Sequence, residues 1–123
     1  FLSEEWVNAF QEYGSDLPTM NFSITCQYEI SGAPQGKVRY FVIFKDGKIT
    51  KAELGKSESP DCLVSTTHDE AISILHQRST VAGSFMKGTL KIDGEYEEYL
   101  LGMNKVRSTN EWENMLLSLR EDL

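Results

Sequence analysis

The sequence has little cysteine and histidine and no long apolar run, and each of these absences excludes a class of protein. Two cysteines, Cys26 and Cys62, are too few for a disulfide framework. We expect buried, reduced thiols, with a single disulfide or a reactive thiol as the open alternatives. The two histidines, His68 and His76, have no cysteine at ligand spacing, so we expect no metal site and no cofactor. No apolar stretch approaches the ~20 residues that cross a bilayer, and no secretory signal is visible at the start, which predicts a chain without a transmembrane segment and a cytoplasmic location.

Basic side chains are scarce relative to acidic ones. Twelve Lys and Arg stand against nineteen Asp and Glu, which gives a formal charge of −7. Because a nucleic-acid-binding protein replaces condensed counterions with cationic side chains, we expect no nucleic-acid partner. A glycine-rich phosphate loop is also lacking, since Gly83, Gly88 and Gly94 do not have its spacing.

The length of 123 residues fits a single domain, which we expect to span residues 1–123 without a linker or an internal repeat. Alternating hydrophobicity and turn signals predict five strands, at residues 21–30, 37–45, 48–54, 61–66 and 88–92. Asp46-Gly47 between two strand-like runs predicts a two-residue hairpin. The first strand is apolar on one face only, which suits a sheet covered on one side. The predicted fold class is α+β, with a five-stranded, mainly antiparallel sheet and helices over one face.

Three predicted helices begin at residues that favour helix N-termini. Ser3 precedes an amphipathic segment that ends near Tyr13. Thr67 and Ser108 are each followed three residues later by a glutamate, which is the capping-box pattern. The last of these helices carries an apolar stripe of Trp112, Met115, Leu116 and Leu119.

The segment 81–101 combines an apolar turn, a short strand and a further helix with almost no spacers. Phe85 and Met86 lie just before Gly88, where the backbone is free, and we expect their side chains to turn inward as the strand begins. The helix that follows carries apolar residues at helical spacing, among them Met103. We interpret this segment as part of the wall of a ligand cavity.

A family resemblance is found in the same segment, in the run Phe85-Met86-Lys87-Gly88-Thr89-Leu90-Lys91-Ile92-Asp93-Gly94. This run resembles the Gly-x-Leu-x-Ile-x-Gly signature of the sterol carrier protein type 2 family. Residues 61–72 resemble that family's passage from a strand into a helix. The resemblance implies a tunnel between the sheet and the helices, in which lipids such as fatty acids, acyl-CoA thioesters and sterols bind without catalysis. Lys87 is a departure, because the family often has a polar uncharged residue there.

The candidate ligand-binding residues are large side chains of the predicted helices and of the turn before the last strand. They are Leu75, Val81, Phe85, Met86, Lys87, Leu100, Met103, Trp112, Met115 and Leu119. Methionine is flexible enough to line a site for ligands of several shapes. Lys87 is the candidate for meeting a carboxylate or phosphate, and a solvated lysine is the equal alternative. From periodicity alone, the apolar members of this set would close the core, and only the resemblance favours a cavity.

No pattern in the sequence leads us to assign a catalytic residue. Ser84, His76 and some acidic residue could be assembled into a Ser-His-Asp arrangement, but nothing in the sequence supports it. The cluster at residues 95–98 is typical of a solvated helix face. We therefore expect a protein that is not an enzyme.

Two rival functions stay open at this point. The first is an enzyme acting on an acyl substrate in the same cavity, which needs a titrating group there. The second is a protein-interaction domain whose core is filled. The expected partner is a lipid or fatty acyl ligand, and a homodimer or a larger protein partner is left open.

Overall fold

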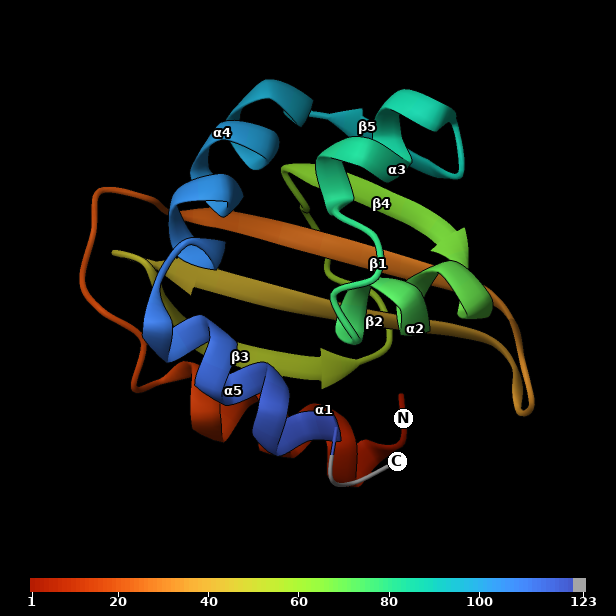
Figure 1. Ribbon diagram of the computed structural model, residues 1–123, viewed down its shortest axis with the longest axis horizontal. Coiled ribbons are helices and arrows are strands. Elements are labelled where there is room, and N and C mark those ends of the chain that lie inside the picture. Colours follow the sequence, from red (N-terminus) through yellow and green to blue (C-terminus); the bar gives the residue numbers. More distant parts are fainter. Residues whose placement is uncertain (121–123) are drawn as a thin grey trace.

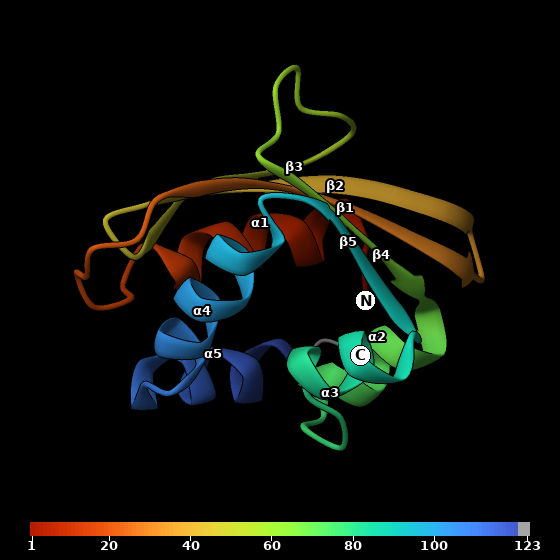
Figure 2. The same ribbon diagram turned by 90° about the horizontal axis from the view of Figure 1, so that it is seen from above.

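Five helices lie on one side of a curved five-stranded sheet in the computed structural model, which describes residues 1–120 (Figure 1). The elements are α1 (Glu4–Gly14), β1 (Ile24–Ala33), β2 (Gly36–Lys45), β3 (Lys48–Leu54), β4 (Cys62–Thr67), α2 (His68–Leu75), α3 (Val81–Lys87), β5 (Leu90–Gly94), α4 (Tyr96–Arg107) and α5 (Asn110–Arg120). In Figure 2 the sheet forms the upper layer, with α4 and α5 beneath one end and α2 and α3 beneath the other. The predicted α+β class is therefore confirmed.

The sheet has the strand order β3-β2-β1-β4-β5. Neighbouring strands are antiparallel except β1 and β4, which are parallel, so the sheet is mixed. Parallel neighbours need a crossover connection, and here the loop 55–61 crosses the face that carries no helices (Figure 2). All five predicted strands are found, with their ends shifted by up to three residues.

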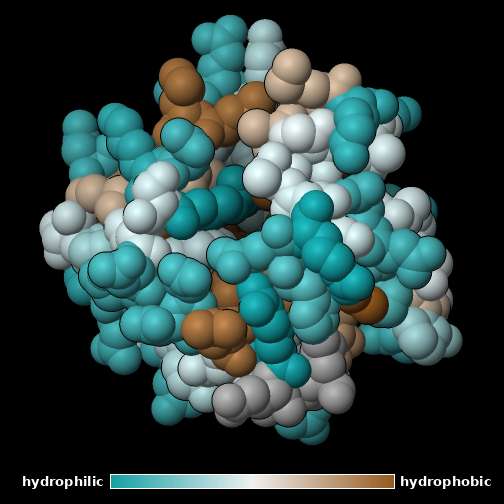
Figure 3. All heavy atoms as spheres, viewed as in Figure 1, coloured by the Kyte–Doolittle hydropathy of each residue, from teal (hydrophilic) through white to brown (hydrophobic). Residues whose placement is uncertain are grey.

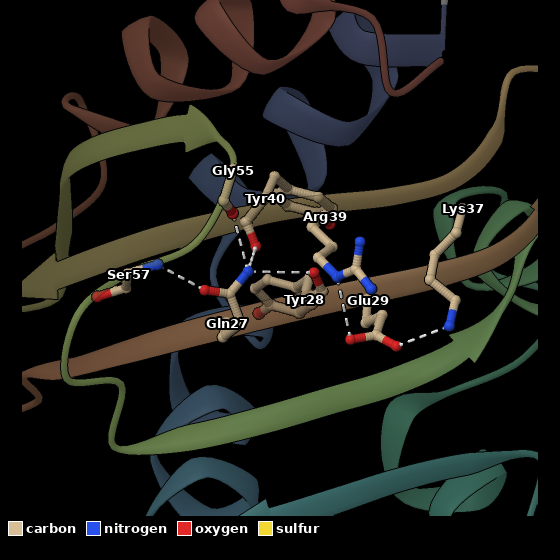
Figure 4. A network of polar contacts seen from close by, with 8 residues as sticks. All are labelled: Gln27, Tyr28, Glu29, Lys37, Arg39, Tyr40, Gly55 and Ser57. Atoms are coloured by element: carbon tan, nitrogen blue, oxygen red, sulfur yellow. Dashed lines mark hydrogen bonds and ion pairs between the residues drawn. The ribbon is translucent and has the colours of Figure 1, made fainter.

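One buried glutamine attaches this crossover loop to the sheet. Gln27 is only 6% exposed, although it lies on the face without helices. Its Nε2 donates to the carbonyls of Tyr40 at 3.1 Å and Gly55 at 2.9 Å, and its Oε1 accepts from the Ser57 amide at 2.7 Å (Figure 4). Ion pairs of Glu29 with neighbouring β2 cations lie beside it on the same face. The amide thus satisfies loop backbone groups that a bare sheet surface would leave unpaired.

The hairpin between β2 and β3 forms at Asp46-Gly47, as predicted. Both residues have positive φ, 53° and 83°, which the mirror-image turns of tight hairpins require. The register shifts by one residue after Ile43, so that Ile49 and Ala52 are both buried although they lie three positions apart. This bulge explains why alternation alone could not show which face of β3 is the inner one.

Two of the three predicted helix caps are confirmed and one is displaced. Ser3 accepts a hydrogen bond from the Trp6 amide at 3.1 Å, and Thr67 accepts from the Glu70 amide at 3.2 Å. The third prediction, Ser108, is wrong, because its hydroxyl donates back to the Asn104 carbonyl. The next residue, Thr109, accepts from the Trp112 amide at 3.2 Å and caps α5. The helices that the structure describes include no segment with the length and hydrophobicity of a membrane span.

The segment before the last strand is a helix and not the predicted turn. Residues 81–87 form α3 between the N-cap Thr80 and Gly88, which ends the helix at φ 81°. Because the side chains of a helix point in several directions, Phe85 and Met86 do not both turn inward, and Met86 is 84% exposed. Two turns of helix are too short to show a clear apolar period in the sequence.

Candidate ligand cavity

A cavity of about 340 Å³ lies between the inner face of the sheet and the helices. This volume is within the range of roughly 300–1,000 Å³ that is usual for sites that bind small organic ligands. Its exposed lining residues are Gln77, Thr80 and Ala82 on one side and Asn104 and Ser108 on the other. The cavity therefore reaches the surface between the pair α2 and α3 and the pair α4 and α5. Figure 3 views the helix side, where hydrophobic atoms show through gaps between mostly hydrophilic side chains.

Apolar side chains of the helices form most of the cavity wall. Six of the ten residues that we listed from the sequence lie here: Leu75, Val81, Leu100, Met103, Trp112 and Leu119. Ala71 and Ile74 of α2 and Leu90 of β5 extend this wall. The helical spacing of the apolar residues in α2, α4 and α5 therefore identified much of the lining.

The other four residues from the sequence lie outside the cavity. Phe85 is half-buried and stacks on Tyr96, with ring centroids 6.0 Å apart. Met86 and Lys87 are exposed at the end of α3, and Met115 is buried in the core without lining the cavity. Phe85, Met86 and Lys87 lie outside the cavity because residues 81–87 are helical, and the helix turns its last residues away from the cavity.

Aromatic residues of α1 and the sheet form a part of the lining that the sequence did not reveal. Trp6 and Phe10 come from α1, and their rings meet edge to face. Tyr28 and Tyr40 come from β1 and β2 and stack at 4.8 Å between centroids. Tyr28 lies on the apolar side of a strictly alternating strand, and this position was the only sequence signal that it faces the helices.

Polar groups gather where β1 meets α4. The hydroxyls of Tyr28 and Tyr99 are 2.9 Å apart, and Arg107 donates from Nη2 to the Tyr99 hydroxyl at 3.1 Å. The Arg107 guanidinium also lies 5.6 Å from the Tyr99 ring centroid and 5.9 Å from that of Trp112. We call Tyr28, Tyr99 and Arg107 the polar cluster of the cavity. Arg107 was missed because a charged residue at a helix end is usually solvated.

The tyrosines around this cluster keep their protons over the neutral pH range. Burial is the largest cause that raises the pKa of Tyr28 and of Tyr99, and it raises the pKa of Tyr40 as well. The Arg107 charge opposes the shift in each case without reversing it. The three hydroxyls are therefore neutral hydrogen-bonding groups rather than anions.

Ser84, the serine of the conceivable hydrolytic arrangement, has a carboxylate as its hydrogen-bond partner. Ser84 is fully buried, and its hydroxyl donates to the Glu70 carboxylate at 3.0 Å rather than to a histidine. Hydrogen bonds from Ser79 and Ser84 hold the pKa of the Glu70 carboxyl below its usual range. This pair joins α2 to α3, and neither residue lines the cavity. Within residues 1–120, no three His, Cys, Asp or Glu side chains come together as a metal site.

Comparisons with known proteins agree with this architecture. A family model, that of the SCP-2 sterol transfer family, matches residues 18–101. A conserved hypothetical protein from Thermus thermophilus, described as possibly sterol carrier protein, has a similar structure with a TM-score of 0.76 at 12% identity, over 97% of this chain and 89% of that one. A crystal structure of sterol carrier protein 2 gives 0.69 at 12% identity, over 97% and 95% of the two chains. Sterol carrier protein 2 like 2 from Aedes aegypti gives 0.60 at 19% identity, over 78% and 88%. No curated protein sequence matches the chain.

Proposed function

The chain belongs to the SCP-2 sterol transfer family, and from this premise we propose that it binds a fatty acid, a fatty acyl-CoA or a sterol-like lipid non-covalently and transfers it. The observation that carries the proposal is the apolar cavity of about 340 Å³ between the sheet and the helices. A protein-interaction domain with a filled core has no need of such a cavity. A structure of palmitated sterol carrier protein 2 like 2 from Aedes aegypti shares the fold and supports palmitate as a first ligand to test.

Burial of an alkyl chain in this cavity supplies enough free energy for binding. Each buried methylene contributes about 0.8 kcal/mol, so a ~16-carbon chain gains on the order of 12 kcal/mol. Loss of translational, rotational and internal freedom removes several kcal/mol of this. The remainder corresponds to a roughly micromolar or lower Kd. Shape and an apolar lining are therefore sufficient, and no covalent step is needed.

We propose that binding proceeds without catalysis. Support comes from the lining residues that the structure describes, whose titratable members are three tyrosines with raised pKa and one arginine. None of these is a nucleophile or a general base near neutral pH. Incubation with palmitoyl-CoA tests this: free CoA released at an enzymatic rate, and lost in a His76→Ala variant, would establish the enzyme alternative instead.

Both tryptophans of the chain line the cavity, which provides a direct binding assay. Trp6 and Trp112 are the only tryptophans, so all of the tryptophan fluorescence reports on this site. Titration with a stearate that carries a nitroxide quencher on its chain should quench this fluorescence to saturation, and excess palmitate should restore it. A control titration with the water-soluble nitroxide alone separates binding from collisional quenching. Absence of saturable quenching would contradict the proposal.

We also propose a cytoplasmic location and a single domain over residues 1–123. The location is supported by Cys26 and Cys62, which are free and buried although they lie directly opposite each other in β1 and β4. Free thiols so placed suit a reducing compartment. Fractionation of the native host, with the thiols titrated in denaturant, tests the location.

A further inference from the structure

We propose that the polar cluster binds the carboxylate of a fatty acid, with Arg107 as the residue that selects anionic over uncharged lipids. This inference rests on the proposed lipid binding in the cavity. The polar cluster holds the carboxylate of the ligand, and the apolar part of the cavity holds its hydrocarbon chain. The cluster joins Tyr28 of β1 to Tyr99 and Arg107 of α4 through contacts of 2.9 and 3.1 Å.

Charge is the first reason to assign this role to Arg107. It is the only charged side chain among the lining residues that the structure describes, in a protein whose formal charge is −7. No carboxylate within residues 1–120 forms an ion pair with it, whereas the ion pairs that do form there lie on the outer face of the sheet. A cation that faces an apolar cavity without an anionic partner attracts an anion more strongly than it would in water.

The geometry of the guanidinium is the second reason. Contacts with the rings of Tyr99 and Trp112 hold it in place at 5.6 and 5.9 Å from their centroids. Arginine has five N–H donors in a planar fork that matches a carboxylate. Its hydrogen bond within the described residues comes from Nη2 and goes to Tyr99, so further donors remain for a ligand. Because the side chain is already fixed, binding costs less conformational entropy.

The two hydroxyls supply one more donor. Tyr28 and Tyr99 each carry a hydroxyl proton, and the hydrogen bond between them uses only one of these two protons. Arg107 occupies an acceptor position on the Tyr99 oxygen and uses neither of these protons. One O–H therefore remains to donate to a ligand carboxylate beside the guanidinium.

The rest of the cavity suits the hydrocarbon chain of the same ligand. Ala71, Ile74 and Leu75 of α2, with Val81 of α3 and Leu90 of β5, form an apolar wall on the side away from α4, the helix that carries Arg107. A ligand with its carboxylate at Arg107 can therefore place its chain between the sheet and α2. Lys87, the head-group candidate from the sequence, is exposed at the end of α3 and does not line the cavity.

The test compares palmitate with hexadecanol, which has the same chain length but no charge. Isothermal titration calorimetry, with each lipid delivered on cyclodextrin, gives both Kd values for the wild type and for Arg107→Gln. We expect the variant to bind palmitate about 10- to 100-fold more weakly, the usual effect of losing hydrogen bonds to a charged group, and to bind hexadecanol within about threefold of wild type. Lys105→Gln is the matched control, since it removes the same charge from an exposed position on α4 outside the cavity and should leave palmitate binding unchanged.

Two further variants separate ligand contact from structural support. Arg107→Lys keeps the charge but loses the planar fork, so palmitate affinity should fall between wild type and Arg107→Gln. Tyr28→Phe removes one hydroxyl and should weaken palmitate binding several-fold without changing hexadecanol binding.

The possible results lead to different conclusions. Equal wild-type affinity for the two lipids, or an Arg107→Gln variant that loses both ligands equally, would overturn the role of Arg107 while lipid binding itself stands. If the wild type binds neither lipid, the proposed function fails, and this inference fails with it.

Discussion

Removal of the buried Gln27 amide should destabilise the protein without changing its cavity, because the amide lies on the outer face of the sheet. Gln27→Met keeps the length of the side chain and removes its donors and its acceptor. The three hydrogen bonds of 2.7–3.1 Å are lost, each with a net value of about 1 kcal/mol, together with a longer one of 3.4 Å to the Tyr28 carbonyl. The loop groups that they satisfy are partly buried, so water replaces them in part. We expect a loss of about 2–3 kcal/mol in the free energy of unfolding.

Urea denaturation followed by circular dichroism measures this loss, with Gln35→Met in the exposed β1–β2 turn as the control. Gln27→Glu gives a sharper test of the reasoning. At neutral pH the introduced carboxylate faces the carbonyls of Tyr40 and Gly55, which raises its pKa in the folded state. The protonated acid can still donate to one of them, so this variant should lose stability as the pH rises through the raised pKa. A change of under about 0.5 kcal/mol for Gln27→Met, or no pH dependence for Gln27→Glu relative to wild type, would refute the role of Gln27.

The remaining predictions concern the cavity, one turn and one carboxylate. Ala71→Trp should fill the apolar end of the cavity and weaken palmitate binding at least about tenfold, whereas Met86→Trp at an exposed position should leave it unchanged. Equal effects of the two substitutions on the palmitate Kd in isothermal titration calorimetry would contradict the assigned lining. Gly94→Ala should lower the free energy of unfolding by about 2–4 kcal/mol, because φ is 94° and the added Cβ would clash with the Asp61 carbonyl oxygen. A Tm within about 2 °C of wild type would contradict this. Glu70 has a lowered pKa in the folded state, so its hydrogen bonds stabilise the fold above the unfolded-state pKa, and this stability is lost as the pH falls through the folded-state pKa. The Tm difference between wild type and Glu70→Gln should therefore shrink from pH 7 to pH 3. A Tm difference that stays constant would argue against this role of Glu70.

The fold could largely be predicted because its strands obey a simple periodicity. The alternation in β1 and the Asp46-Gly47 turn each have one favoured structure. The parallel pairing of β1 with β4 could not be predicted, since it depends on where the chain returns after the loop 55–61. The helix α3 was missed for a different reason: its seven residues are bounded by local signals, the Thr80 cap and the left-handed Gly88, and not by an apolar period.

The cavity was harder to predict than the fold, because hydrophobic periodicity shows which residues are buried and not what they face. Their helical spacing predicts that Met103 and Met115 are buried, and both are. Only Met103 lines the cavity. Trp6 and Tyr40 line it, although neither was among the candidates from the sequence. Arg107 had no sequence signal at all, since its partner Tyr99 lies two helical turns earlier and the contact depends on the whole fold.

Native mass spectrometry of the protein as purified from its expression host, followed by extraction and identification of anything bound, tests lipid binding most directly. We expect a stoichiometric co-purified lipid, released on denaturation, or uptake of one palmitate by protein that arrives empty. An empty protein whose mass does not shift with added palmitate or palmitoyl-CoA would contradict lipid binding in the cavity.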